Sequence, residues 1–174
     1  MSLSTVDKDE IIQFSKLAHD WWDEEGSMSF LHAMSQIRTK FIKLELIEKF
    51  NLKDKKNVLN GLEILDLGCG GGIASEPLSR LGGNLTGIDE SQKLIDVAKQ
   101  HAQNMKLKIN YKCCNIESLS KFKKKYDVIL ALELLEHVNN LDYFCKLITH
   151  LCKNNGIIIL STINKTLLSR MFVI

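Results

Sequence analysis

The sequence predicts an α/β fold with a doubly wound, mostly parallel sheet. Two observations carry the prediction: short apolar runs alternate with helical patterns from Leu62 onward, and a glycine-rich turn follows the first of these runs directly. A chain of 174 residues with 45% apolar content is also long enough to build one domain around its own core. We therefore expect ligands to bind at the carboxyl ends of the strands.

The core of this fold is predicted from Leu62 onward. Five short apolar runs are predicted as strands, over residues 63–67, 84–88, 109–111, 126–131 and 156–160. Helical periodicity lies between them, over residues 73–81, 92–103 and 141–152. Alternation of strand and helix is typical of parallel pairing, because parallel neighbours need a crossover connection.

A helical region precedes this core. Apolar residues recur at helical spacing from Ile11 to Trp21 and again over residues 37–50. A loop is expected between these helices, from Asp23 to about Ala33, and the Lys/Asn-rich stretch 51–60 is expected as a linker. We divide the chain into an N-terminal helical region, residues 1–60, and an α/β core, residues 61–174.

Charge and cysteine content exclude several classes of protein. Lys and Arg total 23 against 21 Asp and Glu, so no nucleic-acid partner is expected. The five cysteines form no C-x-x-C pair, which indicates a reducing compartment. The sequence has no run of about 20 apolar residues to cross a bilayer, and its acidic N-terminus argues against a targeting signal. We expect a cytoplasmic protein, with peripheral contact at the inner membrane as the alternative.

The glycine-rich turn is the first candidate binding site. Gly68, Gly70 and Gly72 let the backbone turn sharply after the first strand and approach a ligand where a Cβ atom would clash. Asp89 ends the second strand, 21 residues beyond Gly68, where a carboxylate can bind both hydroxyls of a ribose. Turn and acid together predict an adenosine-containing cofactor. The alternative is that the glycines only pack helix against strand.

Two details favour S-adenosylmethionine (SAM) over a dinucleotide. Asp66 stands two residues before Gly68, where a carboxylate would repel a pyrophosphate and attract the ammonium group of a methionine moiety. The spacing is G-x-G-G-G, which lacks the G-x-G-x-x-G register of dinucleotide sites. We predict that SAM binds here, with Asp66, Gly68, Gly70 and Asp89 as cofactor-binding residues.

An acidic cluster follows the fourth strand and is the candidate active site. Glu133, Glu136 and His137 arrive at the carboxyl end of the sheet, and their spacing lets one turn of helix or a tight loop converge them on a divalent ion such as Mg²⁺. Such an ion would activate a catechol oxygen. Alternatively, His137 acts as a metal-free general base. A third interpretation makes these solvated loop residues, with Glu136 capping a short helix.

Four motifs give the chain a family resemblance. They are Trp21-Trp22-Asp23 within the helical region, the turn 65–72, the segment 133–138 and the strand end 161–164. With these motifs the sequence resembles the ubiquinone-pathway O-methyltransferases, which methylate polyprenyl dihydroxybenzenes, from about Phe14 to Ile174. The resemblance implies a Rossmann-like class I methyltransferase fold with an N-terminal helical lid.

The resemblance also implies site residues. Arg38, Gly68, Asp89 and Leu132 would contact SAM, with Arg38 offering its guanidinium to the methionine carboxylate. Glu133, Glu136 and His137 would hold Mg²⁺, and Glu133 and His137 are the candidate catalytic residues. Two roles stay open for Trp21 and Trp22, which would either pack in the core or contact a polyprenyl tail.

The function implied is SAM-dependent O-methylation of a polyprenyl catechol, a demethylubiquinol intermediate of ubiquinone biosynthesis. Other ubiquinone-biosynthesis proteins and a membrane surface are the expected partners. Family members continue past Asn164 with another helix and two strands, so the predicted core lacks these C-terminal strands. Two alternatives follow: an inactive or partial SAM-binding fragment in a ubiquinone-assembly complex, or a SAM methyltransferase for another small acceptor.

Overall fold

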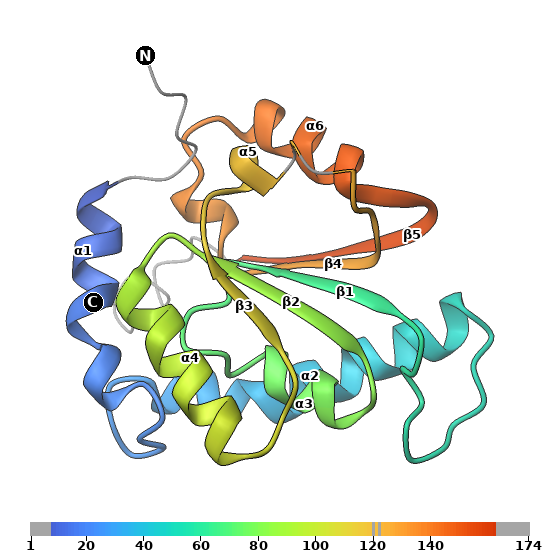
Figure 1. The fold of residues 1–174 in the computed structure, drawn as a ribbon, viewed down its shortest axis with the longest axis horizontal. Coiled ribbons are helices and arrows are strands. Elements are labelled where there is room, and N and C mark those ends of the chain that lie inside the picture. The colour runs from blue at the N-terminus through green and yellow to red at the C-terminus, as the bar shows by residue number, and fades with distance from the viewer. Residues whose placement is uncertain (1–7, 120, 122, 163–174) are drawn as a thin grey trace, which may run out of the picture.

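A parallel β-sheet forms the centre of the computed structural model, which describes residues 8–119, 121 and 123–162 (Figure 1). The five strands of this described part are β1 (Glu63–Leu67), β2 (Asn84–Asp89), β3 (Asn110–Cys113), β4 (Tyr126–Leu132) and β5 (Cys152–Ser161). Their order is β3-β2-β1-β4-β5, and all neighbouring pairs are parallel. The prediction of a doubly wound, parallel α/β sheet is therefore confirmed.

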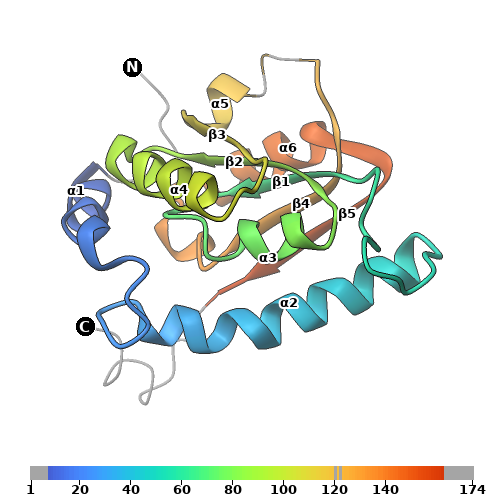
Figure 2. The ribbon, with the colours of Figure 1, turned by 60° about the horizontal axis from the view of Figure 1, so that its bottom comes forward.

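Helices cover both faces of the sheet (Figures 1 and 2). One face carries α5 (Ile116–Leu119) and α6 (Leu141–Leu151), and the other carries α2 (Ser29–Lys49), α3 (Ser75–Arg80) and α4 (Gln92–Asn104). Successive side chains of a strand point to opposite faces of the sheet, so β1 contributes to the hydrophobic core on each face. Leu65 belongs to the core cluster that contains Phe144 of α6, whereas Ile64 belongs to the cluster that contains Leu46 of α2.

Helix α1 (Lys8–Lys16) and the 3-10 turn η1 (Ala18–Asp20) lie at the carboxyl ends of the strands. The Oγ atoms of Ser15 and Ser91, which follows β2, are 2.7 Å apart. The ring of Phe14 contacts the ring of His137, which follows β4, edge to face at 5.5 Å. Helix α1 therefore spans the edge where ligands bind in this class of fold.

Three boundaries differ from the predicted ones. Helix α2 begins at Ser29, inside the predicted loop, and its first turns direct the side chains of His32 and Ser35 toward the carbonyl oxygens of Trp21 and Ile73. The predicted linker 51–60 contributes the fully buried Leu59 to the core. Strand β5 begins at Cys152, directly after α6, so it is longer than the apolar run that predicted it.

Candidate functional site

The glycine-rich turn joins β1 to α3 and adopts the expected tight backbone. Gly68, Gly70 and Gly72 have φ angles of +67°, +51° and +95°, in the left-handed region that favours glycine. Asp89 reaches the turn from the end of β2. Its Oδ2 accepts a hydrogen bond from the Gly70 N–H at 3.0 Å, and its Oδ1 accepts one from the Ser91 N–H at 2.8 Å. The structure thus brings together the turn and the acid that predicted an adenosine cofactor.

The carboxyl group of Asp66 lies beneath this turn. It is only 2% exposed, and the Ser75 hydroxyl donates a hydrogen bond to its Oδ2 at 2.5 Å. Burial raises the pKa of Asp66 from 3.8 to about 6. Burial likewise raises the pKa of Asp89. The chain therefore holds two carboxyl groups under and beside the turn whose negative charge is costly until a cation approaches.

Glu133 is the first residue of the predicted acidic cluster and has a left-handed backbone, with φ +51°. The Arg38 guanidinium, from α2, donates to its Oε1 and forms an ion pair with it. The Ser161 hydroxyl, at the end of β5, donates to the same oxygen at 2.9 Å. Within the described part of the chain, Oε2 is buried and has no hydrogen-bond partner. Ser161 belonged to a sequence motif, but nothing in the sequence connected it to Glu133.

The other two members of the cluster follow in the next turn. Glu136 and His137 lie in the 3-10 turn η2 (Leu135–His137), where Oε2 of Glu136 accepts a hydrogen bond from the Thr162 hydroxyl at 3.0 Å. Among residues 8–119, 121 and 123–162, no group of three or more His, Cys, Asp or Glu side chains is arranged to hold a metal ion. The three predicted Mg²⁺ ligands are therefore close in sequence and are not assembled as one site.

Leu132, predicted to contact SAM, ends β4 next to Glu133 and pairs with Ser161 in the sheet. Beside it, the side chain of Leu134 covers Gly68: a Cβ atom added to that glycine would lie 2.8 Å from Leu134 Cδ1. Ile163 and Asn164, the second half of the last sequence motif, lie outside the described residues.

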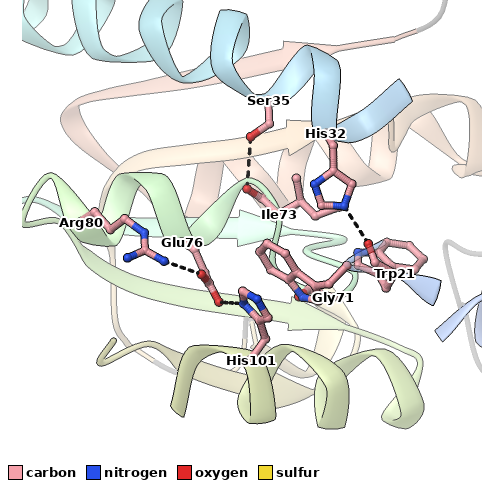
Figure 3. Close-up of polar contacts among 9 residues, drawn as sticks. Trp21, His32, Ser35, Gly71, Ile73, Glu76, Arg80 and His101 are labelled. Carbon is pink, nitrogen blue, oxygen red and sulfur yellow. Dashed lines mark hydrogen bonds and ion pairs between the residues drawn. The ribbon is translucent and has the colours of Figure 1, made fainter. Parts of the chain in front are cut away.

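The two tryptophans connect the N-terminal helices to the glycine-rich turn. The Trp22 indole N–H donates to the Gly71 carbonyl oxygen at 3.0 Å, and the Trp22 ring stacks on the His101 ring with centroids 3.5 Å apart. Trp21 is 6% exposed and lies against Gly70 and Gly71. Figure 3 shows His32 of α2 pointing at the Trp21 carbonyl, with 2.9 Å between its Nε2 and that oxygen.

A buried carboxylate extends this connection into the core. Glu76 is 2% exposed and lies between Arg80, 3.2 Å away, and His101, 2.7 Å away (Figure 3). Trp22, His101 and Glu76 thereby connect the segment after η1 to α4 and α3. Sequence reasoning missed Glu76 and His101, because no motif contains them and their partners lie in other elements.

Comparison with known proteins identifies the family. Residues 65–160 match the model of a methyltransferase domain. The chain is 47% identical over 172 residues to a ubiquinone biosynthesis O-methyltransferase of Pelagibacter ubique (strain HTCC1062), an alignment that covers 99% of this chain and 71% of that protein. It is 40% identical to the protein of the same name from Coxiella burnetii (strain RSA 331 / Henzerling II), covering 100% of this chain and 70% of that one. The chain belongs to the ubiquinone biosynthesis O-methyltransferase family.

Solved structures agree with this family in fold. A magnesium protoporphyrin IX methyltransferase from Synechocystis PCC 6803 with bound SAH superposes with a TM-score of 0.68 at 23% identity, over 95% of this chain and 76% of that one. A SAM-dependent methyltransferase from Clostridium acetobutylicum ATCC 824 gives a TM-score of 0.65 at 24% identity, over 85% and 56%. For this ubiquinone biosynthesis O-methyltransferase family member, the predictions of a Rossmann-like class I methyltransferase fold and of SAM as cofactor are confirmed.

The part of this family member that the structure describes contains no helix that is both long and apolar enough to cross a bilayer.

Proposed function

We propose that this family member transfers the methyl group of SAM to a hydroxyl of a polyprenyl catechol, a demethylubiquinol intermediate of ubiquinone biosynthesis. The names of its relatives support the pathway. The observation that carries the hydroxyl chemistry is Glu133, whose buried Oε2 has no hydrogen-bond partner in the described chain. Such an oxygen, at the carboxyl edge of the sheet, is suited to receive the proton of an acceptor hydroxyl.

We assign the cofactor contacts to residues at the two ends of the carboxyl edge of the sheet. Asp89, already hydrogen-bonded to the turn through Gly70, would bind the ribose hydroxyls. Arg38 would bind the methionine carboxylate, because a guanidinium and a carboxylate form strong, directional hydrogen bonds. The backbone of Gly68 and Gly70 would line the path between them, with Leu132 at its end. SAM carries its methyl group on a sulfonium, which makes that group electrophilic without help from the protein. These residues therefore bind and orient the cofactor and do not need to activate it.

The acceptor side needs a base. As the acceptor oxygen takes the methyl group, the carbon–sulfur bond breaks, the carbon–oxygen bond forms and the hydroxyl proton must leave. Glu133 and His137 are the candidate acceptors of that proton; Glu133 pairs with Arg38 of α2, and the His137 ring lies against Phe14 of α1. Ser161 holds Glu133 by its Oε1, which leaves Oε2 for the acceptor.

Mg²⁺ at Glu133, Glu136 and His137 stays a prediction. The donor types suit Mg²⁺ poorly as arranged, because Glu133 faces the positive charge of Arg38 and Glu136 faces Thr162. No step of the proposed reaction is therefore assigned to the ion. Loss of turnover in a chelator, restored by added Mg²⁺, would support the metal, and unchanged turnover would contradict it.

The acceptor is tested by methyl transfer from labelled SAM. We expect incorporation into a catechol that carries a short prenyl chain and none into the same compound with both hydroxyls already methylated. Asp89→Ala should abolish transfer and SAM binding together. SAM binding without transfer to any catechol would support a SAM-binding fragment in an assembly complex. Transfer only to catechols without a prenyl chain would support a different small acceptor.

Contact with a membrane surface and with other ubiquinone-biosynthesis proteins belongs to the same proposal. One feature supports it: Phe30, Ile37, Phe41 and Leu44 of α2 are each more than half exposed and recur at helical spacing. Co-sedimentation with vesicles should fall when Ile37 and Phe41 are both replaced by Ser. Equal sedimentation of the two proteins would argue against this surface.

A further inference from the structure

We propose that Trp21 is a further cofactor-binding residue, whose buried indole N–H donates a hydrogen bond to an oxygen of SAM at the glycine-rich turn. This inference rests on the proposed binding of SAM at that turn. It gives the first tryptophan of the pair a ligand role and leaves the second with a structural one.

The two neighbouring indoles differ in how their N–H groups are used. The N–H of Trp22 ends on the Gly71 carbonyl oxygen, and its ring stacks on His101. Trp21 is more deeply buried, at 6% exposure, yet within residues 8–119, 121 and 123–162 its Nε1 has no hydrogen-bond acceptor. A buried donor left unpaired is energetically costly, so native proteins rarely keep one without a partner.

The Trp21 ring lies against the backbone that the cofactor must approach. A Cβ atom added to Gly71 would lie 2.2 Å from Trp21 Cδ1 and 2.7 Å from its Nε1. A Cβ atom added to Gly70 would lie 2.5 Å from Cζ2. The pyrrole edge of the indole, which carries the N–H, therefore faces Gly71, and the benzene edge faces Gly70.

This contact explains the extra glycine of the turn. Gly68, Gly70 and Gly72 have left-handed backbones, whereas Gly71 is not among the glycines with positive φ. The backbone angle at residue 71 does not require glycine, but the Trp21 ring leaves no room for a side chain there. Gly71, the middle one of three consecutive glycines and the one by which the turn departs from an alternating pattern, thus makes room for Trp21 beside the cofactor.

Gly70 places this ring next to the cofactor. Its N–H binds Asp89, the proposed ribose ligand, while its Cα side faces Trp21. SAM offers two kinds of oxygen to a donor in this position, the ribose hydroxyls and the methionine carboxylate. Both are hydrogen-bond acceptors on a ligand that covers the turn. A ligand that lacks the methionine carboxylate therefore shows which of the two oxygens accepts the bond.

The chain carries two tryptophans, so each can be observed separately. In Trp22→Phe, Trp21 is the sole indole fluorophore, and we expect its emission to change as SAM or S-adenosylhomocysteine saturates the protein. In Trp21→Phe, the remaining Trp22 emission should stay constant at the same ligand concentrations. Circular dichroism of both variants checks that they are folded.

An isosteric replacement isolates the N–H. In the Trp22→Phe background, growth with 3-benzothienylalanine in place of tryptophan puts sulfur where the Trp21 N–H was and keeps the size of the ring. We expect SAM affinity to fall about 5- to 10-fold, the effect of one lost hydrogen bond, in calorimetric titration. The same loss with 5′-methylthioadenosine would assign the bond to the ribose, and a loss with SAM alone would assign it to the carboxylate.

Unchanged SAM affinity after the sulfur replacement, together with constant Trp21 emission, would overturn the inference while leaving SAM binding intact. Failure of the unmodified chain to bind SAM at all would overturn the proposed function first, and the inference with it.

Discussion

Arg38 and Glu133 form an ion pair across the carboxyl edge of the sheet, although 95 residues separate them in the chain. Their side chains are 19% and 16% exposed, so the pair is largely shielded from water. If Arg38 binds the methionine carboxylate as proposed, that carboxylate and Glu133 compete for one guanidinium. Glu133 then holds Arg38 in position before the cofactor arrives and is released when it binds.

This competition predicts that Glu133→Gln binds SAM more tightly while turnover falls. A neutral amide holds Arg38 less strongly than a carboxylate, so the dissociation constant should drop by about 3- to 10-fold. Isothermal titration measures it without need of activity. Glu136→Gln is the matched control, because Glu136 contacts Thr162 and not Arg38, and it should leave SAM affinity unchanged. Weaker binding by Glu133→Gln would refute the competition.

The contact between Gly71 and Trp21 predicts a strong coupling between the two positions. Gly71→Ala should destabilise the fold by about 1–3 kcal/mol in urea denaturation, because the new methyl group meets the indole ring. In the double variant with Trp21→Ala the methyl group has room. The loss of stability of the double variant should therefore be smaller than the sum of the two single losses by about 1 kcal/mol or more.

Gly61→Ala is the control for this cycle. Gly61 has φ +91° and nothing within 4 Å of an added Cβ atom, so its cost is backbone strain alone. Its effect should simply add to that of Trp21→Ala. Additive costs at Gly71 as well would show that the ring does not occupy that space.

We predict that His101, which contacts both Trp22 and Glu76, stabilises the fold. His101→Ala removes the ring on which Trp22 stacks and leaves the buried Glu76 with Arg80 alone, so the free energy of unfolding should fall by about 2–3 kcal/mol. The exposed His150 near the end of α6 provides the comparison, with a change below about 0.5 kcal/mol for His150→Ala. Similar losses in the two variants would contradict the structural role of His101.

The buried Asp66 predicts a pH-dependent difference in stability. Burial raises its folded-state pKa from 3.8 to about 6, so the folded protein favours the protonated form. This contribution to stability is present at low pH and is lost as the pH rises through about 6, because the unfolded chain ionises more easily. Asp66→Asn lacks that loss. The free energy of unfolding of Asp66→Asn, relative to that of the unsubstituted protein, should therefore rise by about 1–2 kcal/mol between pH 4.5 and pH 8.

Chemical denaturation at the two pH values measures this gain, and a difference independent of pH would contradict it. Asp142→Asn, at an exposed position in the first turn of α6, is the control. The same Asp66→Asn protein should bind SAM more weakly at pH 8, since the negative charge proposed to attract the ammonium group of the cofactor is gone.

The sequence by itself determined the sheet, the cofactor turn and the family. Apolar alternation, the left-handed glycines and the position of Asp89 at a strand end are local features, because each depends on residues a few positions apart. Only the tertiary structure decided that Arg38 pairs with Glu133, that Ser161 holds the same carboxylate, and that Trp21 and Trp22 use their N–H groups differently. These contacts join side chains from separate elements, and no pattern along the chain reports which elements will meet in space.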